Sequence, residues 1–198
     1  MRQTIIFATG NEGKMREIRQ ILEGMDVEIL SMKQAGIEMD IIEDGTTFME
    51  NAIIKAKAVA TKVRGIVIAD DSGLEIDYLN KEPGIYSARY LGEDTSYDIK
   101  NAELLKRMEG VEEEKRTARF VCAMAAVLPD GEMLTTQGVV EGRVAHRIEG
   151  ENGFGYDPIF YLPEYGCTSA QITEEEKNAI SHRGRALRKM REELEKRI

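Results

Sequence analysis

Two adjacent aspartates, Asp70 and Asp71, directly follow an apolar run, Gly65 to Ala69, that is typical of a buried strand. A second acidic pair, Glu43 and Asp44, lies in an earlier polar stretch. Carboxylate oxygens are the protein ligands that Mg2+ prefers, and a carboxylate can also accept the proton of an attacking water. Side-by-side aspartates repel each other unless a cation offsets their charge. The acidic residues therefore indicate a Mg2+ site or, equally, a solvated turn after a strand.

A short loop rich in glycine and polar residues joins a predicted first strand, Thr4 to Thr9, to a helix predicted over Lys14 to Leu22. Backbone N–H groups at a helix N-terminus attract anions, and Lys14 adds a full positive charge. The spacing is not that of a Walker P-loop, and taken alone such a loop is more often a plain turn. As a phosphate site it would comprise Thr9, Gly10, Asn11, Glu12, Gly13 and Lys14.

A third segment, Asn152 to Pro158, places an aromatic ring between two glycines and an aspartate shortly after them. Glycines let a loop fold tightly over a flat ligand, and an aromatic ring offers a stacking surface. A carboxylate or a backbone group can read the edge of a base. The composition is somewhat more common in surface turns, but it is also that of a base pocket, whose residues would be Phe154, Gly155, Tyr156 and Asp157.

Lys177, His182 and Arg183 stand near the start of the last predicted helices. Lysine can contact a phosphate as a point charge, whereas histidine and arginine can donate hydrogen bonds to keto oxygens. The chain has two histidines, and a lone histidine is usually structural. Of the two, His182 is the better candidate for a ligand contact.

Two further predicted elements position candidate residues. Thr47 and Glu50 have capping-box spacing and begin a helix predicted to run to about Val63, with Thr47, Asn51 and Lys55 on one polar stripe. The strand before the acidic pair would deliver it at a carboxyl end, where ligands of open α/β sheets bind.

The remaining patterns predict an α/β fold with a mixed sheet, because strands and helices alternate early and an antiparallel hairpin follows. A capping box and a final helix close the chain. The elements are a strand at Val27 to Leu30, a helix at Asn101 to Met108, hairpin strands at Phe120 to Leu128 and Met133 to Val140, and a capping box at Thr173 and Glu176.

Composition narrows the class of protein. The chain has 198 residues and a formal net charge of -9, which argues against nonspecific binding to nucleic acid but allows a small anionic substrate in a local cationic pocket. Cys122 and Cys167 stand far apart and suggest neither a zinc site nor a disulfide framework, so a cytoplasmic protein is expected. No apolar stretch is long enough to span a membrane. We expect one domain over residues 1–198.

In their order along the chain, these segments resemble the ITP/XTP pyrophosphatase family of house-cleaning nucleotide hydrolases. The matching strings run from Phe7 to Leu187 and are jointly highly specific. They are ATGNEGK, EDGTTFMENAIIKA, ADDSGLEID, PGIYSARY, ENGFGYDPIF and SHRGRAL.

The resemblance implies hydrolysis of ITP, dITP or XTP to the monophosphate and pyrophosphate, with Mg2+ as cofactor. It also implies an elongated mixed sheet flanked by helices, two lobes with a central substrate cleft, and a homodimer. Many relatives have a Gly-Gly pair before the Pro-Gly that here follows Leu79, Asn80, Lys81 and Glu82, so the shape of this loop is open.

The resemblance also assigns roles to residues. It makes Glu43 and Asp71 ligands of the metal, and Asp71 also the acceptor of the proton of water. Thr9, Asn11, Lys14 and Lys55 would hold the triphosphate, and Ser72 would complete the acidic loop with Asp70. Phe154, Gly155, Tyr156 and Asp157 would shape the base pocket, Lys177 would contact the substrate, and His182 and Arg183 would recognise the 6-keto edge.

Three other functions stay open at this point. A pyrophosphatase for another altered nucleotide would differ only in its base preference. A regulatory module that binds a nucleotide without hydrolysing it would not need the cluster of Glu43, Asp70 and Asp71. An RNA-binding protein that stacks bases on Phe154 and Tyr156 is disfavoured by the acidic charge balance.

Overall fold

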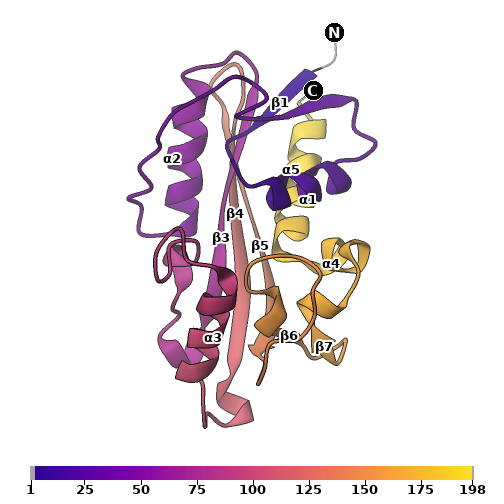
Figure 1. Cartoon of the computed structure of the whole chain (residues 1–198). Helices are drawn as coiled ribbons and strands as arrows, with labels where there is room; N and C mark the ends of the chain where they lie inside the picture. The colour runs from indigo at the N-terminus through magenta and orange to yellow at the C-terminus, as the bar shows by residue number, and fades with distance from the viewer. Residues whose placement is uncertain (1–2, 198) are drawn as a thin grey trace. The chain divides into compact units, whose positions relative to one another are not determined.

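The computed structural model describes residues 3–197 and shows an α/β fold with one mixed sheet (Figure 1). Its strand order is β2-β1-β3-β4-β5-β6-β7. Strand β1 runs parallel to β2 and β3, whereas β6 is antiparallel to both β5 and β7, as the prediction of a mixed sheet required. The strands are β1 (Gln3–Phe7), β2 (Val27–Ser31), β3 (Ile66–Ile76), β4 (Thr117–Val127), β5 (Met133–Val144), β6 (Phe160–Leu162) and β7 (Cys167–Thr168).

Four of the α-helices begin at side-chain caps that local sequence encodes. Asn11, Thr47, Ser96 and Thr173 each accept a hydrogen bond from a backbone N–H in the first turn of the helix that follows. The helices are α1 (Glu12–Ile21), α2 (Phe48–Ala60), α3 (Tyr97–Arg107), α4 (Glu174–Ile180) and α5 (His182–Glu195). None of them, within residues 3–197, is long and apolar enough to cross a membrane.

The chain forms two compact units, each assembled from segments that are distant in sequence. The first unit comprises the residues up to Asp71, Cys122–Gly138 and the residues from His182 onward. The second comprises Ser72–Val121 and Val139–Ser181. A single domain over residues 1–198 and a cleft between two lobes both stay predictions. Residues 1, 2 and 198 lie outside the part of the chain that the structure describes.

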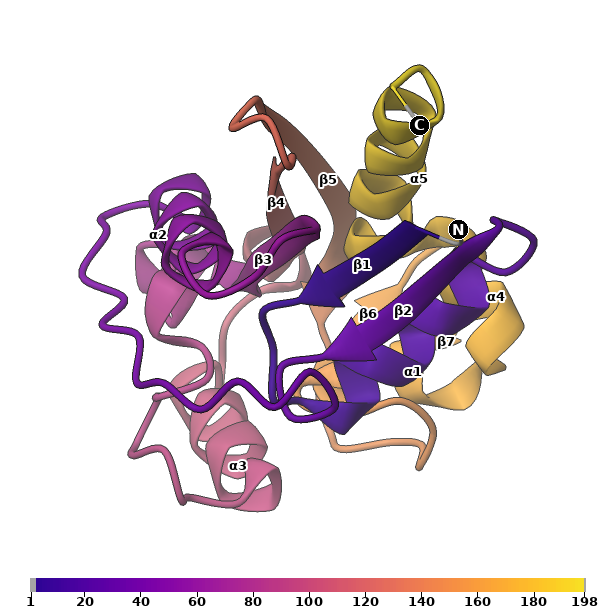
Figure 2. The ribbon, with the colours of Figure 1, turned by 90° about the horizontal axis from the view of Figure 1, so that it is seen from above.

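In the first unit, β3 and β4 separate α2 from α1 and α5 (Figures 1 and 2). Apolar side chains of α1 and α5 pack with those of the strands into a core that excludes water. Members of this core are Ile5, Phe7, Met15, Ile18, Ile66, Ile68, Cys122, Met124, Leu187 and Met190. The packing fixes one face of β3 against α1 and α5.

Strand β3 corrects one sequence prediction. The apolar run was expected to end at Ala69 with a turn, but the strand continues to Ile76. The neighbouring β1 ends first, because its pairing with β3 stops at Phe7 and Ile68. Asp70 and Asp71 therefore lie within β3, just beyond the carboxyl end of β1.

Other boundaries also moved. The helix expected from Asn101 to Met108 begins a turn earlier, because the Ser96 side chain caps it. The helix expected to reach Val63 ends at Ala60. Strands β6 and β7 were not predicted, and both are too short to show a clear period in the sequence.

The second unit has its own apolar core, which includes Leu74, Leu104, Phe120, Val140, Tyr156 and Phe160. The loop that departs from the expected Gly-Gly pattern follows β3 in this unit. Asn80 and Lys81 there have φ angles of 54° and 68°, in the left-handed region that glycine adopts without strain. The backbone shape is thus one that a Gly-Gly pair would also favour.

Candidate active site

The loop between β1 and α1 has the geometry expected of an anion site. Asn11 caps α1, because its Oδ1 accepts a hydrogen bond from the Lys14 backbone N–H at 3.0 Å. The Thr9 hydroxyl oxygen accepts one from the Asn11 N–H at 3.1 Å. Gly10 is exposed, and a Cβ added there would meet no protein atom within 4 Å. The loop leaves room for a ligand close to its backbone.

Asp70 lies at the centre of a buried set of charges in the first unit. Its side chain is 1% exposed, and its Oδ2 lies 3.0 Å from Lys14 Nζ and 3.5 Å from Arg183 Nε. Burial by itself would raise the pKa of Asp70, but the charges of Lys14 and Arg183 outweigh it and hold that pKa below its usual range. Asp70 is therefore a permanent anion that holds two cations in place.

Arg183, predicted to read a base edge, is fully buried in this structure. It is the second residue of the last helix, α5, is 2% exposed, and forms an ion pair with Glu17 of α1 as well as with Asp70. Two carboxylates thus fix one guanidinium. Base recognition by Arg183 and by His182, which is also buried in the first turn of α5, stays a prediction.

Asp71 belongs to a second set of polar residues, on the other face of β3. Successive strand residues point to opposite faces, so the two aspartates do not repel each other as strongly as their adjacency suggested. Lys55 Nζ lies 3.7 Å from Asp71 Oδ1 and 3.1 Å from Glu43 Oε2. Asn51 Nδ2 donates to Asp71 Oδ2 at 3.2 Å. The predicted metal ligands Glu43 and Asp71 therefore approach one common point.

The electrostatics of this second set suit proton transfer. Burial raises the pKa of Asp71, and the charge of Lys55 and the hydrogen bond from Asn51 oppose that rise. Burial lowers the pKa of Lys55, but nearby Asp70, Asp71 and Glu43 together raise it above its ordinary value. Asp71 is thus a carboxylate of raised basicity beside a lysine that stays charged.

The polar stripe of α2 faces inward. Asn51 is 0% exposed, and besides donating to Asp71 its Oδ1 accepts the Gly45 N–H at 2.9 Å. Asn51 therefore ties the loop that carries Glu43 to the strand that carries Asp71. Sequence analysis placed Asn51 beside Lys55 on the stripe but did not include it in the site.

Glu17 is the other residue that sequence analysis missed. It lies three residues after Lys14 in α1, is 5% exposed, and forms an ion pair with Arg183. A charged residue on the core side of a short helix is the signal that could have found it.

In the second unit, Asp157 organises the predicted base loop. Its Oδ2 accepts hydrogen bonds from Lys177 Nζ at 2.7 Å and from the Phe154 N–H at 2.9 Å, and its Oδ1 accepts one from the Ser169 hydroxyl at 2.6 Å. Lys177 Nζ also lies 4.6 Å from the centre of the Phe154 ring. The aspartate therefore shapes the loop and holds Lys177 under the ring.

A glycine on each side of Phe154 makes this loop conformation possible. Gly153 and Gly155 have φ angles of 71° and 66°. A Cβ on Gly153 would come within 2.2 Å of an Asp157 carboxylate oxygen. The Phe154 ring can be presented at this angle only between residues without side chains.

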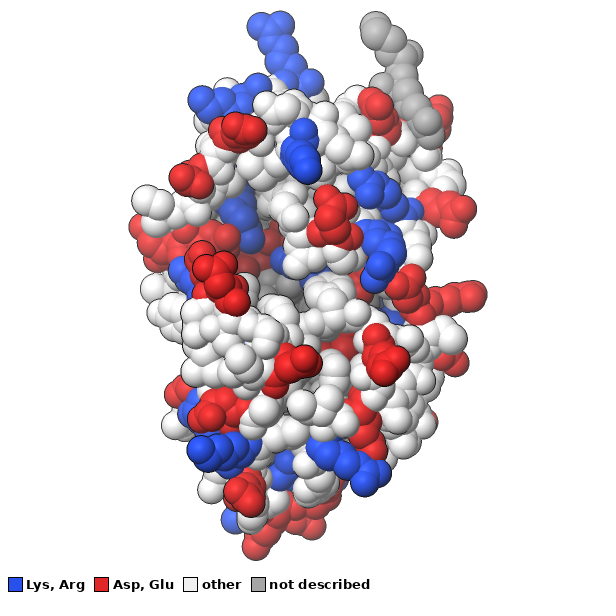
Figure 3. All heavy atoms as spheres, viewed as in Figure 1, with Lys and Arg blue, Asp and Glu red and all other residues white. Residues whose placement is uncertain are grey.

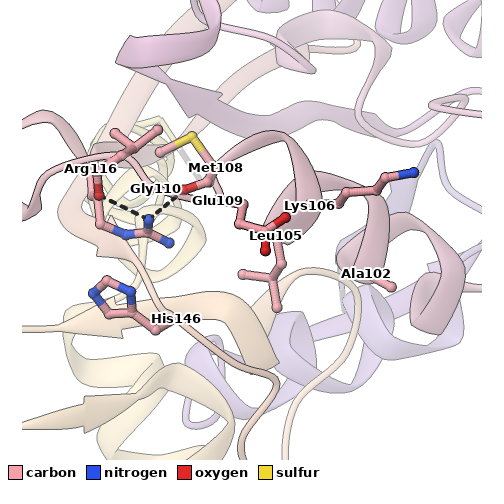
Figure 4. Close-up of a pocket in the computed structure, with 9 residues that line it drawn as sticks. Ala102, Leu105, Lys106, Met108, Glu109, Gly110, Arg116 and His146 are labelled. Carbon is pink, nitrogen blue, oxygen red and sulfur yellow. Dashed lines mark hydrogen bonds between the residues drawn. The ribbon is translucent and has the colours of Figure 1, made fainter.

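A cavity of about 560 Å³ lies elsewhere in the second unit, and none of the residues that line it was predicted as a site residue (Figure 4). Its wall includes the C-terminal end of α3 with Arg116 and His146. The Arg116 guanidinium donates to four backbone carbonyls, of Met108, Val111, Val144 and Ala145, which indicates a structural role.

The structure thus brings together, in the first unit, the phosphate loop, Asp70 with Arg183, and Glu43 with Lys55 and Asp71. Within residues 3–197 no group of three or more His, Cys, Asp or Glu side chains is arranged to hold a metal. The assignment of Glu43 and Asp71 as metal ligands stays a prediction. Ser72 and the base loop belong to the second unit. Their approach to the acidic residues stays a prediction.

Comparisons with known proteins identify the family and the fold. The Ham1 family model matches residues 5–193. The "dITP/XTP pyrophosphatase" of Caldanaerobacter subterraneus subsp. tengcongensis is 49% identical over 195 residues, which cover 98% of this chain and 97% of that protein. The Bacillus subtilis (strain 168) protein of the same name is 48% identical over 195 residues, covering 98% of each chain. A solved Staphylococcus aureus Ham1 protein aligns with a TM-score of 0.88 at 41% identity, covering 99% of this chain and 100% of that one.

Proposed function

The chain belongs to the Ham1 family, and on this premise we propose that it hydrolyses noncanonical purine nucleoside triphosphates to the monophosphate and pyrophosphate. Relatives named for dITP and XTP cover almost the whole chain, and ITP has the same 6-keto group. The observation that carries the proposal is the buried cluster in which Lys55 and Asn51 contact Asp71 and Glu43 approaches the same lysine.

The two carboxylates fit a divalent cation. Glu43 and Asp71 converge on one ammonium group, which shows that both can face a single positive charge. Pyrophosphatases generally use a divalent metal, and we propose Mg2+, which takes one or two carboxylates and completes its shell with water and phosphate oxygens. When bound, the cation supplies charge neutralisation at the triphosphate.

In this proposal, residues of the first unit have different roles in the reaction. Asp71 accepts the proton of a water that attacks the α-phosphorus in line with the leaving pyrophosphate. Lys55 stays protonated beside it and faces the developing charge. Lys14 and the N–H groups of the Thr9 to Lys14 loop hold the phosphates, and the ion pair with Asp70 orients the Lys14 side chain.

Discrimination against adenine rests on hydrogen-bond donors. In the proposal His182 and Arg183 donate to the 6-keto oxygen of the base. An adenine presents an amino group at that position, and a buried donor left without an acceptor costs about 1–3 kcal/mol. The base itself stacks in the loop that Phe154 and Tyr156 shape, and Lys177, which lies on α4, contacts the substrate beside that loop.

The proposed setting is the cytoplasm, with a homodimer as the working form and with neither nucleic acid nor membrane as a partner. Figure 3 supports the first exclusion, because on the face that it shows Lys and Arg are interspersed with Asp and Glu. Such a surface lacks the continuous basic area that nucleic-acid backbones require.

Product analysis tests the proposal. Pyrophosphate and orthophosphate release would be measured from ITP, XTP, dITP, GTP and ATP with and without Mg2+. We expect pyrophosphate from the first three, only with the metal, and little from GTP or ATP. Orthophosphate as the product would mean attack at the γ-phosphorus. Faster hydrolysis of a pyrimidine nucleotide or another modified nucleotide would change the assigned base.

A matched pair of variants tests the role of Asp71. Asp71→Asn should abolish turnover while the circular dichroism spectrum is unchanged, and Asp40→Asn, which alters an exposed aspartate of the same unit, should retain it. Normal turnover in Asp71→Asn would remove Asp71 from the chemistry. Nucleotide binding without any hydrolysis in the unmodified protein would instead indicate the regulatory module.

A further inference from the structure

Helix α3 contacts two loops of the second unit through the neighbouring side chains of Lys100 and Asn101. Asn101 Nδ2 donates to the Gly155 carbonyl oxygen at 3.1 Å, inside the base loop. Lys100 Nζ donates to the Ala88 carbonyl oxygen at 2.7 Å, in the segment Pro83 to Tyr90. Both side chains are buried, at 2% and 1% exposure. One helix therefore holds backbone atoms of both loops.

The two loops are also joined to each other. The Tyr156 hydroxyl donates to the Ser87 carbonyl oxygen at 2.5 Å. The Ser87 hydroxyl in turn accepts the Leu74 N–H of β3 at 2.9 Å and donates to the Gly84 carbonyl at 2.6 Å. The ring of Tyr97, on α3, packs edge-on against the Tyr156 ring with 5.1 Å between centres. Helix α3, the base loop and the segment Pro83 to Tyr90 thus each contact the other two.

The base loop needs such support because its own backbone is permissive. Gly153 and Gly155 lie on both sides of Phe154 and adopt positive φ angles, and glycine populates either sign of φ about equally. Asp157 fixes the N–H of Phe154, but the carbonyl of Gly155 is fixed by Asn101. Without that bond the peptide between the two rings can rotate.

Asn101 itself is placed at a cost. Its buried Oδ1 has no hydrogen-bond partner among residues 3–197. A buried acceptor left in this way costs about 1–3 kcal/mol, and a leucine would avoid that cost. The amide is thus better suited to fixing the Gly155 carbonyl than to stabilising the fold.

We propose that Asn101 is a positioning residue for base selection, which sets the Gly155 peptide and with it the angle between the Phe154 and Tyr156 rings. The proposal rests on the proposed function for the nature of the base. Asn101 acts through the loop and does not touch the phosphates, so its loss should impair the choice between bases and leave phosphate binding unchanged.

The test compares Asn101→Asp and Asn101→Ala with Lys106→Ala, an exposed change on the same helix. For each protein we would measure kcat/KM for ITP and ATP, and the dissociation constants of ITP, ATP and inorganic tripolyphosphate by calorimetry. We expect the ratio of kcat/KM for ITP to kcat/KM for ATP to fall about tenfold or more in both Asn101 variants, which corresponds to about 1.4 kcal/mol. The affinity for tripolyphosphate should stay within about twofold, and Lys106→Ala should match the unmodified protein.

An unchanged ITP to ATP ratio in the Asn101 variants would overturn the proposal, and so would an equal loss of affinity for tripolyphosphate, because that indicates general damage. If the Asn101 variants fail to fold, Tyr156→Phe decides, since it removes only the bond to Ser87 and should lower the same ratio. If the unmodified protein binds ITP without hydrolysing it, the proposed function fails, and the ratio of binding constants still tests Asn101.

Discussion

Asn51 offers the sharpest test of how the site is held together. The change Asn51→Ala removes the hydrogen bond to the Asp71 carboxylate and the acceptor of the Gly45 N–H. A hydrogen bond to a charged group contributes about 1.5–3 kcal/mol, and a buried N–H without an acceptor costs about 1–3 kcal/mol. Gly45 is only partly buried, so water can replace part of the second loss. We expect the free energy of unfolding to fall by about 3 kcal/mol.

Two assays measure the effect of Asn51→Ala. Urea denaturation followed by circular dichroism gives the free energy of unfolding, and a loss of this size lowers Tm by about 6–12 °C in a chain of this length. Pyrophosphate release gives kcat, which should fall about tenfold or more because Asp71 loses its orientation, with the roughly 10²–10⁴-fold that a general base contributes as the upper limit.

The control is Lys57→Ala, an exposed change on the same helix, which should alter stability by no more than about 0.5 kcal/mol. Asn51→Ala with the stability and kcat of the unmodified protein would refute the inference that Asn51 couples the Glu43 loop to Asp71. A loss of stability with full kcat would leave Asn51 a structural residue only.

Further predictions concern other parts of the chain. Burial raises the pKa of the Cys122 thiol to about 12, so a thiol reagent should modify only Cys167 in the native protein, and two reactive thiols before denaturation would contradict this burial. A Cβ at Gly138 would lie 2.1 Å from a backbone oxygen of α5, so Gly138→Ala should lower the free energy of unfolding by about 1–3 kcal/mol in urea, and an unchanged value would show that α5 can shift. Hydrogen bonds from Arg119 hold the pKa of Asp77 in the folded protein below its ordinary value. The ionised Asp77 therefore stabilises the fold at any pH above the ordinary pKa, and this stabilisation is lost as the pH falls through the lower pKa of the folded protein. The Tm difference between the unmodified protein and Asp77→Asn should therefore exist at neutral pH and vanish in strong acid; a difference that persists in acid would have another cause.

Local signals in the sequence determined where several helices begin. Thr47 and Thr173 were recognisable from the glutamates three positions after them, and both cap helices in the structure. Caps and turns are set by hydrogen bonds between near neighbours, so no distant part of the chain has to be known. The motifs that carry the resemblance are local in the same sense, and they sufficed for the family and the α/β class.

The length of β3 was decided by tertiary structure. Nothing near Asp70 states that the strand continues, because the pairing that extends it comes from strands far away in sequence. Continuation of the strand sends Asp70 toward Lys14 and Arg183, and Asp71 toward Lys55 and Asn51. The separate environments of the two aspartates follow from this alternation.

Burial of polar residues was likewise decided only by the folded chain. Sequence analysis included neither Glu17 nor Asn51 in the site, and each is buried because a partner from a distant segment meets it. The cost of removing a charge or an amide from water depends on that partner, which periodicity cannot identify. The sequence by itself therefore determined which chemical groups the protein carries and where its helices start, and the tertiary structure decided which of those groups face one another.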